Sequence, residues 1–498
     1  MINNLSYMKI RLLYTVLTLL CALVSTGAEV RHISLEDAIM LARTRSVDAA
    51  VALNTLRSAY WEYRTFRAGL LPEVTFKATV PSYSKQYSSY QNSDGSYSFV
   101  HNDNLSMSGS LLLEQRIWLT GGTIAVSSSL DFMRQLSGTV GNRYMSVPVA
   151  LRLTQPIFGV NDVKWNRRIE PVRYREAKAN FISASEDVAM TAIQYYFNLL
   201  SSKQNEASAR QNVSNAEKLY EVALAKRKMG RISDNDVLQI ELNLLNSRST
   251  LTTYESQVKS DMFRLRTFLD LDTTETIEPE IPHETPRVKV IFDQALAYAI
   301  ENNAFVDNIR RRQLEADYQV ASAKGAQRQI SLFAQVGYTG TGRNFHGAYD
   351  PLNDNQVVEI GMSIPILDWG KRRGRVKVAE SNRELVRSRL RKERAEFSEN
   401  LYILVERFNN QQEQLAIAVR ADEIATKRYD SSVETFMIGK ISALDLNDSQ
   451  TSKDSARLKY LSELFSFWYY YYQLRSLTLR DFATDSPIDA DIEKILNM

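Results

Sequence analysis

The stretch that decides the fold reads GRISDND at residues 230–236, and a near copy, GKISALD, follows at residues 439–445. In each copy the glycine suits the left-handed conformation that ends a helix. The serine and the aspartate three residues later form a pattern close to the capping box that starts a helix. Each copy therefore predicts a tight turn between two helices. The offset of 209 positions from Gly230 to Gly439 indicates that the chain is duplicated.

A second pair of segments, QPIF and IPIL, has the same offset. Their prolines, Pro156 and Pro365, each precede a glycine turn by 74 residues, and the two halves match over this length without a gap. A rigid helix demands such a match, because one inserted residue rotates everything after it by about 100°. We predict long helical hairpins at 161–269 and 370–480. The first helix of each has roughly 60 residues and is on the order of 90 Å long.

Each half opens with a helix and continues with strands. ISLEDAIMLARTRS (33–46) matches VIFDQALAYAIENN (290–303), and apolar residues recur in both at spacings of three and four, which predicts helices. Alternation with a period of two then predicts strands with one apolar and one polar face. These strands are expected in 72–80 and 147–158 of the first half, and in 330–338 and 358–367 of the second.

The returning helices carry a sevenfold spacing, which predicts the narrow seam of a coiled coil. Its members are Val237, Leu244, Leu251 and Val258 in the first half, and Leu446, Lys453, Tyr460 and Phe467 in the second. The remaining positions are strongly polar. We therefore expect a wall one helix thick with water on both sides. The aromatic run FWYYYYQLR (467–475) is interpreted as packing between these helices rather than as a ligand site.

The two halves differ mainly in their strand regions, which are 72–158 in the first half and 329–367 in the second. The longer region holds a polar loop, SYSKQYSSYQNSDGSYS, and an additional hairpin. In this hairpin LSMSGSLLLEQRIW and TIAVSSSLDFM flank LTGG, whose glycines suit a tight turn. Two possibilities are open: the additional hairpin joins the other strands, or it folds outside their sheet.

The first 28 residues predict a secretory signal peptide, in which Lys9 and Arg11 precede the apolar segment LLYTVLTLLCALV and small residues follow. Cys21, the single cysteine, is either removed with this leader or lipid-modified. Removal is favoured, because Leu20 is bulkier than lipoprotein processing usually accepts. Without the leader, 59 basic residues face 58 acidic ones, which gives no support for a nucleic acid partner.

No chemical site emerges from the sequence. The histidines 32, 101, 283 and 346 are scattered, so no metal site is predicted. The glycine-rich segment DWGKRRGRV lacks the spacing of a nucleotide-binding loop. No run of 18 apolar residues follows the leader, so no membrane-spanning helix is predicted. We predict neither a cofactor nor an enzymatic activity.

A signal peptide followed twice by a helix, a strand pair and a very long helical hairpin resembles the TolC family of outer-membrane efflux and secretion channels. The resemblance covers essentially the whole mature chain. It is carried by the opening SLEDAIMLA, the two glycine turns and the strand-to-helix junctions, whose residues are Pro156, Phe158, Pro365, Trp369 and Gly370. On this basis residues 29–270 and 291–482 are two repeats, 271–290 is an equatorial linker and 483–498 is a C-terminal tail.

The resemblance implies a mixed fold and a homotrimer in the outer membrane of a Gram-negative bacterium. Each chain would give four transmembrane strands, or more if the additional hairpin joins, to a shared 12-stranded β-barrel. This barrel would continue into a long periplasmic α-helical, coiled-coil barrel. Two hairpins are too few to close a barrel alone, since about eight strands are needed. The implied partners are outer-membrane lipid, a periplasmic adaptor and an inner-membrane transporter of the RND or ABC type.

In the family, the glycine-centred hairpin tip docks the adaptor. The matching residues here are Met229, Gly230, Arg231, Ile232, Ser233, Ile438, Gly439, Lys440, Ile441 and Ser442. Apolar side chains within a polar rim suit such docking, and the two basic residues would orient the partner. The plainer alternative is that the two serines only cap helices, an effect worth roughly 1 kcal/mol.

Asp445 and Asp448 match the paired aspartates that line the closed entrance in the family. In a trimer they would form two carboxylate rings that attract cations, and crowding should raise some of their pKa values. The alternative is two solvated helix residues. Asp236 matches an aspartate that locks the entrance through a tyrosine and an arginine. Phe436 and Ile441 occupy those two positions here, so the lock needs other partners, with Lys440 or Arg231 as candidates.

We therefore predict a passive, gated export duct for multidrug efflux or type I secretion. The main alternative is a secreted trimeric coiled coil that acts as an adhesin or spacer. That alternative explains the helices but not the paired amphipathic strands in both halves. An enzyme is a more distant alternative, because no nucleophile–base pair or metal cluster is evident in the sequence.

Overall fold

The computed structural model describes residues 30–137, 140–272, 275–327, 329–363, 367–438 and 440–488, together with residues 492 and 495. The predicted signal peptide, with Cys21, lies outside the described residues. So do Pro365 at a predicted junction and Gly439 at a predicted turn. What the sequence indicates for these positions stays a prediction.

The chain divides into two compact units, and each unit takes segments from both repeats. The helical unit comprises the described parts of residues 1–55, 179–303 and 398–498. The sheet unit comprises the described parts of 56–178 and 304–397. The two repeats are therefore interleaved within each unit.

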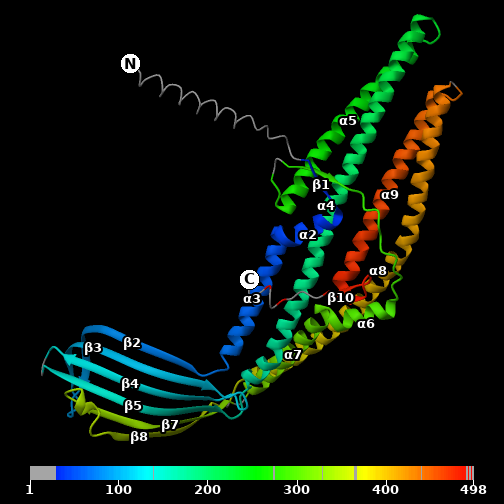
Figure 1. Cartoon of the computed structure of the whole chain (residues 1–498). Coiled ribbons are helices and arrows are strands. Elements are labelled where there is room, and N and C mark those ends of the chain that lie inside the picture. Colours follow the sequence, from blue (N-terminus) through cyan, green and yellow to red (C-terminus); the bar gives the residue numbers. More distant parts are fainter. Residues whose placement is uncertain are drawn as a thin grey trace, which may run out of the picture. The chain divides into compact units, whose positions relative to one another are not determined.

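The long helices of the two repeats match residue for residue. Helices α4 (Asp162–Lys228) and α8 (Lys371–Met437) have 67 residues each. Helices α5 (Asp234–Leu269) and α9 (Ala443–Thr478) have 36 residues each, and all four boundaries repeat at the predicted offset of 209. In Figure 1, α5 returns beside the end of α4 and α9 beside the end of α8. The prediction of two long helical hairpins is confirmed.

The opening helices are also duplicated. Helices α2 (Leu35–Arg45) and α6 (Phe292–Asn302) have 11 residues each, and α3 (Val47–Ala68) and α7 (Ala304–Gly325) have 22 each. The helices expected in 33–46 and 290–303 are confirmed. A second helix directly after each of them was not predicted.

Among the described residues, no helix combines the length and the apolar character needed to cross a membrane.

The helical unit also contains a pair of short strands. Strand β1 (Val30–Ile33) pairs in parallel with β6 (Thr276–Pro279), which belongs to the segment predicted as a linker. Tyr196 is buried beside this pair, and its hydroxyl donates to the carbonyls of Ile33, at 2.9 Å, and Glu280. Burial raises the pKa of Tyr196, so the phenol stays a neutral donor. This residue therefore ties the start of the described chain to the linker.

The strands at the other end of the chain are shorter. Strand β9 (Arg480–Asp481) pairs with β10 (Ser486–Pro487) in antiparallel orientation. Nearby in sequence, Arg475 donates to Glu186 at 2.9 Å, and Arg43 donates to the same carboxylate at 2.5 Å. The Glu186 side chain is only 1% exposed, so both guanidinium groups are needed to offset its desolvation.

The aromatic run at 467–475 packs inside the helical unit. Phe467 is buried with its ring centroid 5.5 Å from that of Phe408 on α8, and the ring of Tyr471 lies 6.0 Å from Phe408. These contacts confirm the packing interpretation of the run. The predicted seam is buried at Val237 and Leu244, whereas its next members along α5 are half-buried.

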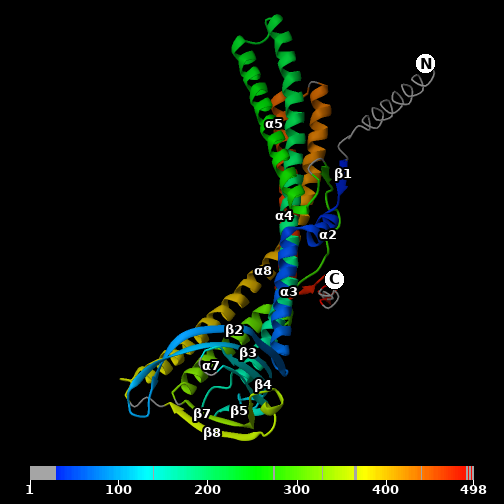
Figure 2. The same ribbon diagram turned by 90° about the vertical axis from the view of Figure 1, so that its left-hand side faces the viewer.

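The sheet unit is built on an antiparallel sheet that contains six strands among the described residues, in the order β2-β3-β4-β5-β7-β8. Their bounds are β2 Glu73–Gln91, β3 Tyr97–Arg116, β4 Thr123–Gln135, β5 Gly141–Pro156, β7 Gln329–Gly342 and β8 Asn353–Ser363, with a short 3-10 turn, η1, at His346–Ala348 between the last two. The additional hairpin is β3–β4, and it joins the same sheet as the other strands. Figure 2 shows this sheet as an open arc with β2 and β8 at its two ends.

The two faces of the sheet differ as the alternation predicts. One row of directly paired residues is apolar across five strands, β2 to β7, and ends at Gln356 on β8; its apolar members are Val74, Leu113, Val126, Leu151 and Val336. The adjacent row, on the opposite face, is mostly polar and consists of Glu73, Glu114, Ala125, Arg152, Gln335 and Val357. The apolar residues of the first row are between 37% and 63% exposed. The sheet therefore offers one apolar and one polar surface.

The buried aromatic packing makes Phe408 a sensitive position. We predict that Phe408→Ala lowers the free energy of unfolding by about 3–5 kcal/mol, because it leaves a cavity beside Phe467. Thermal unfolding of the purified protein, followed by circular dichroism, measures this effect. Glu413→Ala changes an exposed residue of the same helix and should alter stability by less than about 0.5 kcal/mol. Equal losses in the two variants would contradict the proposed importance of this packing.

Candidate functional site at the hairpin tips

The first hairpin tip closes with a defined helix end. Gly230 has a φ of +68°. Its amide donates to the carbonyl of Arg227 at 2.9 Å, and the amide of Arg231 donates to that of Lys226 at 3.0 Å. This pair of bonds is the Schellman motif, which satisfies carbonyls that a helix end would otherwise leave free. A Cβ added to Gly230 would meet no atom within 4 Å, so a side chain there would point away from the chain.

The second tip repeats the outer bond of this motif. The amide of Lys440 donates to the carbonyl of Thr435 at 3.1 Å, which corresponds to the Arg231–Lys226 bond at the offset of 209. Gly439, the expected left-handed residue, lies outside the described residues. The matching bond supports the same helix end in both repeats.

Both tips start their returning helix with a complete capping box. Ser233 Oγ accepts from the amide of Asp236 at 3.1 Å, and the amide of Ser233 donates to Asp236 Oδ2 at 3.2 Å. In the second tip, the corresponding distances between Ser442 and Asp445 are 3.2 and 3.0 Å. The capping interpretation of these four residues is confirmed.

The caps also set the charge state of two predicted gate residues. Hydrogen bonds from the Ser442 side chain and backbone hold the pKa of Asp445 below its usual value, and Ser233 does the same for Asp236. Each carboxylate therefore stays ionised within a single chain. The upward shift expected from crowding in a trimer acts in the opposite direction and stays a prediction.

Asp448 has a partner that the sequence reasoning missed. Arg428 Nη2 on α8 lies 2.8 Å from Asp448 Oδ2 on α9, and both side chains are more than half exposed. An exposed pair of this kind is worth about 0–1 kcal/mol, so its main effect is on local charge. The distances of Arg428 and Asp448 from the turn in the sequence could have predicted this ion pair. Arg428 precedes Gly439 by 11 residues and Asp448 follows it by 9, so antiparallel helices bring them to nearly the same height.

The two tips carry different ion pairs. In the first tip, Arg227 Nε lies 2.6 Å from Asp234 Oδ1. The corresponding positions of the second tip are Phe436 and Ala443, which cannot form this pair. Arg231 and Lys440 are exposed and form no ion pair with any residue that the structure describes. Neither replaces the family lock on Asp236 within one chain.

The tips expose apolar side chains. Met229 is 59% exposed and Ile438 is 67% exposed, as predicted. Ile232 and Ile441 are only half-buried rather than fully displayed, because both lie inside the turn next to the cap serines. Leu444, at 77% exposure, was not predicted. The tip surface is therefore apolar at its outer positions and charged around them.

The predicted strand-to-helix junctions are held by polar caps in the sheet unit. Strand β5 ends at Pro156, Phe158 is exposed, and Asn161 Oδ1 accepts from the amide of Lys164 at 2.9 Å where α4 begins. In the second junction, Asp368 accepts from the amides of Gly370 at 3.0 Å and Arg372 at 3.1 Å. Both Trp369 and Gly370 have a positive φ, of +53° and +83°. Trp369 is also 89% exposed.

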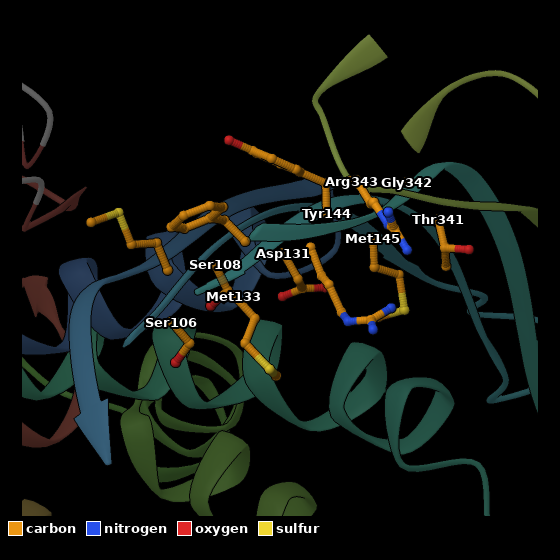
Figure 3. Close-up of a pocket in the computed structure, with 12 residues that line it drawn as sticks. Ser106, Ser108, Asp131, Met133, Tyr144, Met145, Thr341, Gly342 and Arg343 are labelled. Atoms are coloured by element: carbon orange, nitrogen blue, oxygen red, sulfur yellow. The ribbon is translucent and has the colours of Figure 1, made fainter. Parts of the chain in front are cut away.

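The polar face of the sheet contains a pocket of about 790 Å³ that sequence reasoning missed. Its lining comes from β3, β4, β5 and β7 and from Arg343, which follows β7, and it includes Asp131 and Arg143. In Figure 3, the side chains of Ser106, Asp131 and Met133 point to one side of the sheet, and that of Tyr144 points to the other. The three charged residues line the pocket together with the apolar Met133 and Met145. Among the residues described, no cluster of histidine, cysteine or acidic side chains is placed to hold a metal ion.

Comparison with known proteins gives a family and a fold. Residues 38–270 and 299–463 match the family model described as outer membrane efflux protein. No curated protein sequence matches the chain significantly. The CmeC outer membrane channel of Campylobacter jejuni is similar in structure, with a TM-score of 0.65 and 14% identity over 93% of this chain and 88% of that one.

Two further channels have similar structures. VceC of Vibrio cholerae gives a TM-score of 0.60 at 15% identity, over 91% of this chain and 97% of that one. The open-state MtrE outer membrane channel of Neisseria gonorrhoeae gives 0.57 at 14% identity, over 89% of this chain and 88% of that one. At these identities, the likeness concerns the fold.

The capping boxes predict a local effect on the tips. Ser233→Ala and Ser442→Ala should each cost about 1 kcal/mol, equivalent to roughly five-fold faster amide exchange in the first turn of α5 or α9. Hydrogen–deuterium exchange of the purified protein measures this change. Ser432→Ala is the control, because that hydroxyl donates to the carbonyl of Arg428 within a helix and caps nothing. Unchanged exchange in both cap variants would show that the boxes do not hold the tips.

Proposed function

We propose that this chain, which belongs to the outer membrane efflux protein family, is the outer-membrane duct of a tripartite export system. Members of this family are channels of the outer membrane that work in efflux. The chain is therefore a protein of the Gram-negative outer membrane with a long helical part in the periplasm. The observation that carries the proposal is the exact duplication of a long helical hairpin that ends twice in the same capped turn.

We propose that three copies assemble around one continuous lumen. The sheets of the three chains would form one β-barrel, with the apolar row toward lipid and the polar face toward the lumen. The hairpins would form the wall of the periplasmic tunnel, which suits helices that are mostly polar. The amphipathic sheet disfavours the alternative of a secreted coiled-coil adhesin, since an adhesin has no use for an exposed apolar face.

The hairpin tips would dock a periplasmic adaptor. The exposed Met229, Ile438 and Leu444 support this role, because apolar side chains at the end of a polar hairpin lack a partner within the described chain. The adaptor would connect the duct to an inner-membrane transporter of the RND or ABC type. The duct itself is passive, and the energy for multidrug efflux or type I secretion would come from that transporter.

Asp445, Asp448 and Asp236 would line a gate at the periplasmic entrance. Rings of carboxylates lower the energy of cations in a pore mouth and raise that of anions. Two features modify this proposal for the present chain. Asp445 and Asp236 are fixed by their caps, and Arg428 partly neutralises Asp448. The Arg428–Asp448 pair would therefore take part in setting the selectivity of the entrance.

The gate is tested by ion selectivity. Purified trimer in planar bilayers should form long-lived, cation-preferring pores. Asp445→Asn combined with Asp448→Asn should shift the reversal potential in a KCl gradient toward zero, because two carboxylates per chain are lost from the entrance. Glu284→Gln with Asp485→Asn makes the same charge change at exposed positions outside the long helices and should leave the potential unchanged.

A further variant is expected to change the cation selectivity in the opposite direction. Arg428→Ala frees Asp448 and should strengthen the cation preference, whereas Arg420→Ala removes a cation that pairs with Glu423 on the same helix and should have less effect. Pores whose selectivity does not respond to any of these changes would refute the gate. An absence of conductance would refute the duct.

Docking is tested at the glycines of the tips. Gly230→Trp with Gly439→Trp should abolish export while the trimer stays in the outer membrane, because a side chain at position 230 would point away from the chain onto the docking surface. Gly95→Trp is a matched control, since Gly95 also has a positive φ, +84°, and open space around its Cβ position, but lies in the turn between β2 and β3. Normal export by the double variant would refute docking at the tips.

A further inference from the structure

We infer that each chain contributes six strands to the shared barrel, so that the trimer closes around 18 strands instead of the 12 that the family resemblance implies. This inference rests on the proposed trimeric duct and extends it. It concerns the additional hairpin β3–β4 and the two edge strands, β2 and β8.

The additional hairpin is paired on both of its outer edges. Strand β3 is hydrogen-bonded to β2 from Glu73↔Glu114 to Gln91↔Tyr97, with one irregularity. Strand β4 is hydrogen-bonded to β5 from Thr123↔Thr154 to Gln135↔Gly141. Removal of this hairpin from the sheet would leave both edges unpaired and force β2 to pair anew with β5. The hairpin is therefore an internal part of the sheet.

The hairpin also spans the full height of the sheet. Its turn reaches the end where β5 passes into α4, because Asn161 Nδ2 donates to the carbonyl of Trp118 at 2.9 Å. Gln155 Nε2 donates to the carbonyl of Thr120 at 3.1 Å. The guanidinium group of Arg167 lies 4.3 Å from the centroid of the Trp118 ring. These contacts anchor the turn at the junction and make a loop outside the sheet a poor description of the hairpin.

The faces of the hairpin match those of its neighbours. Leu113 of β3 and Val126 of β4 lie between Val74 and Leu151 in the apolar row, in direct register. Strands β3 and β4 have 20 and 13 residues, and a tilted transmembrane strand needs about 9–11. Both strands are long enough to cross a bilayer, and their apolar side continues the surface that would face lipid.

The edges of this sheet fit a second copy of the chain. Among the described strands, β2 and β8 are the ends of the order, and each pairs with a single neighbour. An unpaired backbone group in lipid costs several kcal/mol, so these edges need strands beside them. Six strands are too few to close on themselves, since about eight are needed. Because the number of antiparallel strands is even, β2 and β8 run in opposite directions. Strand β8 of one copy can therefore pair with β2 of the next copy in the same antiparallel arrangement.

The strand number sets the width of the exit. The diameter of a barrel grows roughly linearly with strand number, so 18 strands give about 1.5 times the diameter of 12 and about twice the cross-section. Natural barrels of about 16–18 strands leave an open aqueous channel. The charged lining of the pocket on the polar face, with Asp131, Arg143 and Arg343, would then face this water-filled lumen.

Electron cryomicroscopy of the full-length purified trimer in lipid nanodiscs tests the inference by counting strands. We expect 18 strands and a barrel about 1.5 times as wide as a 12-stranded one. A trimer with 12 strands overturns this inference and leaves the proposed duct intact. A particle without a shared barrel overturns the proposed duct and the inference with it.

Cysteine pairs test the position of the hairpin independently, since the single natural cysteine lies in the predicted leader. Lys77→Cys with Ser110→Cys joins β2 to β3, and Thr123→Cys with Thr154→Cys joins β4 to β5, at directly paired positions. Both pairs should form disulfides within one chain in the membrane, detected by mass spectrometry of the peptides. Ser110→Cys with Ser129→Cys joins β3 to β4 and forms wherever the hairpin lies. Crosslinking of this control pair alone would place the hairpin outside the sheet and overturn the inference.

Discussion

The structure depends on the rigid periodicity of the long helices. A helix turns by about 100° for each residue, so one insertion would rotate every later side chain away from its partners. The two repeats obey this constraint strictly: α4 and α8 have equal lengths, as do α5 and α9, and their capping boxes and helix ends fall at the same offset. This constraint does not fix the side chains, so the two tips have matching capping boxes but carry different ion pairs, Arg227–Asp234 and Arg428–Asp448.

The sheet follows a different rule. A whole hairpin can be added to an antiparallel sheet without disturbing the direction or the faces of the strands around it, because strands are added in pairs and side chains alternate with a period of two. The repeats accordingly differ in the sheet and agree in the helices. Helix α6 follows α2 by 257 positions (292 − 35), whereas α8 follows α4 by 209, so the first repeat has 48 more residues between these helices. The hairpin β3–β4 accounts for most of that difference.

The sequence predicted the features that depend on local patterns. The glycine and the capping box located both turns, and the alternation located the strands and their faces. It did not predict that β3–β4 lies inside the sheet, because alternation determines which face a side chain occupies and not which strand is its neighbour. For the same reason it missed the pairing of β1 with β6. The helix break between α2 and α3 was missed because Ser46, where the backbone becomes extended, carries no proline or glycine signal. Ile232 and Ile441 were expected to be exposed because they lie at the turn of a polar hairpin where no other segment was expected to cover them, but the turn itself half-buries them.

The parallel pair β1–β6 has a consequence for the order in which the chain acquires its structure. Strand β1 begins the described chain at Val30, and its partner starts at Thr276, so the partner is synthesised only after the first repeat is complete. Tyr196 is likewise without one of its two acceptors until Glu280 has emerged. Contacts between such distant segments form late, since the intervening chain must first be brought together. The first repeat therefore completes its contacts only after the connecting segment has been synthesised. The two halves of the exported chain cannot finish folding one after the other.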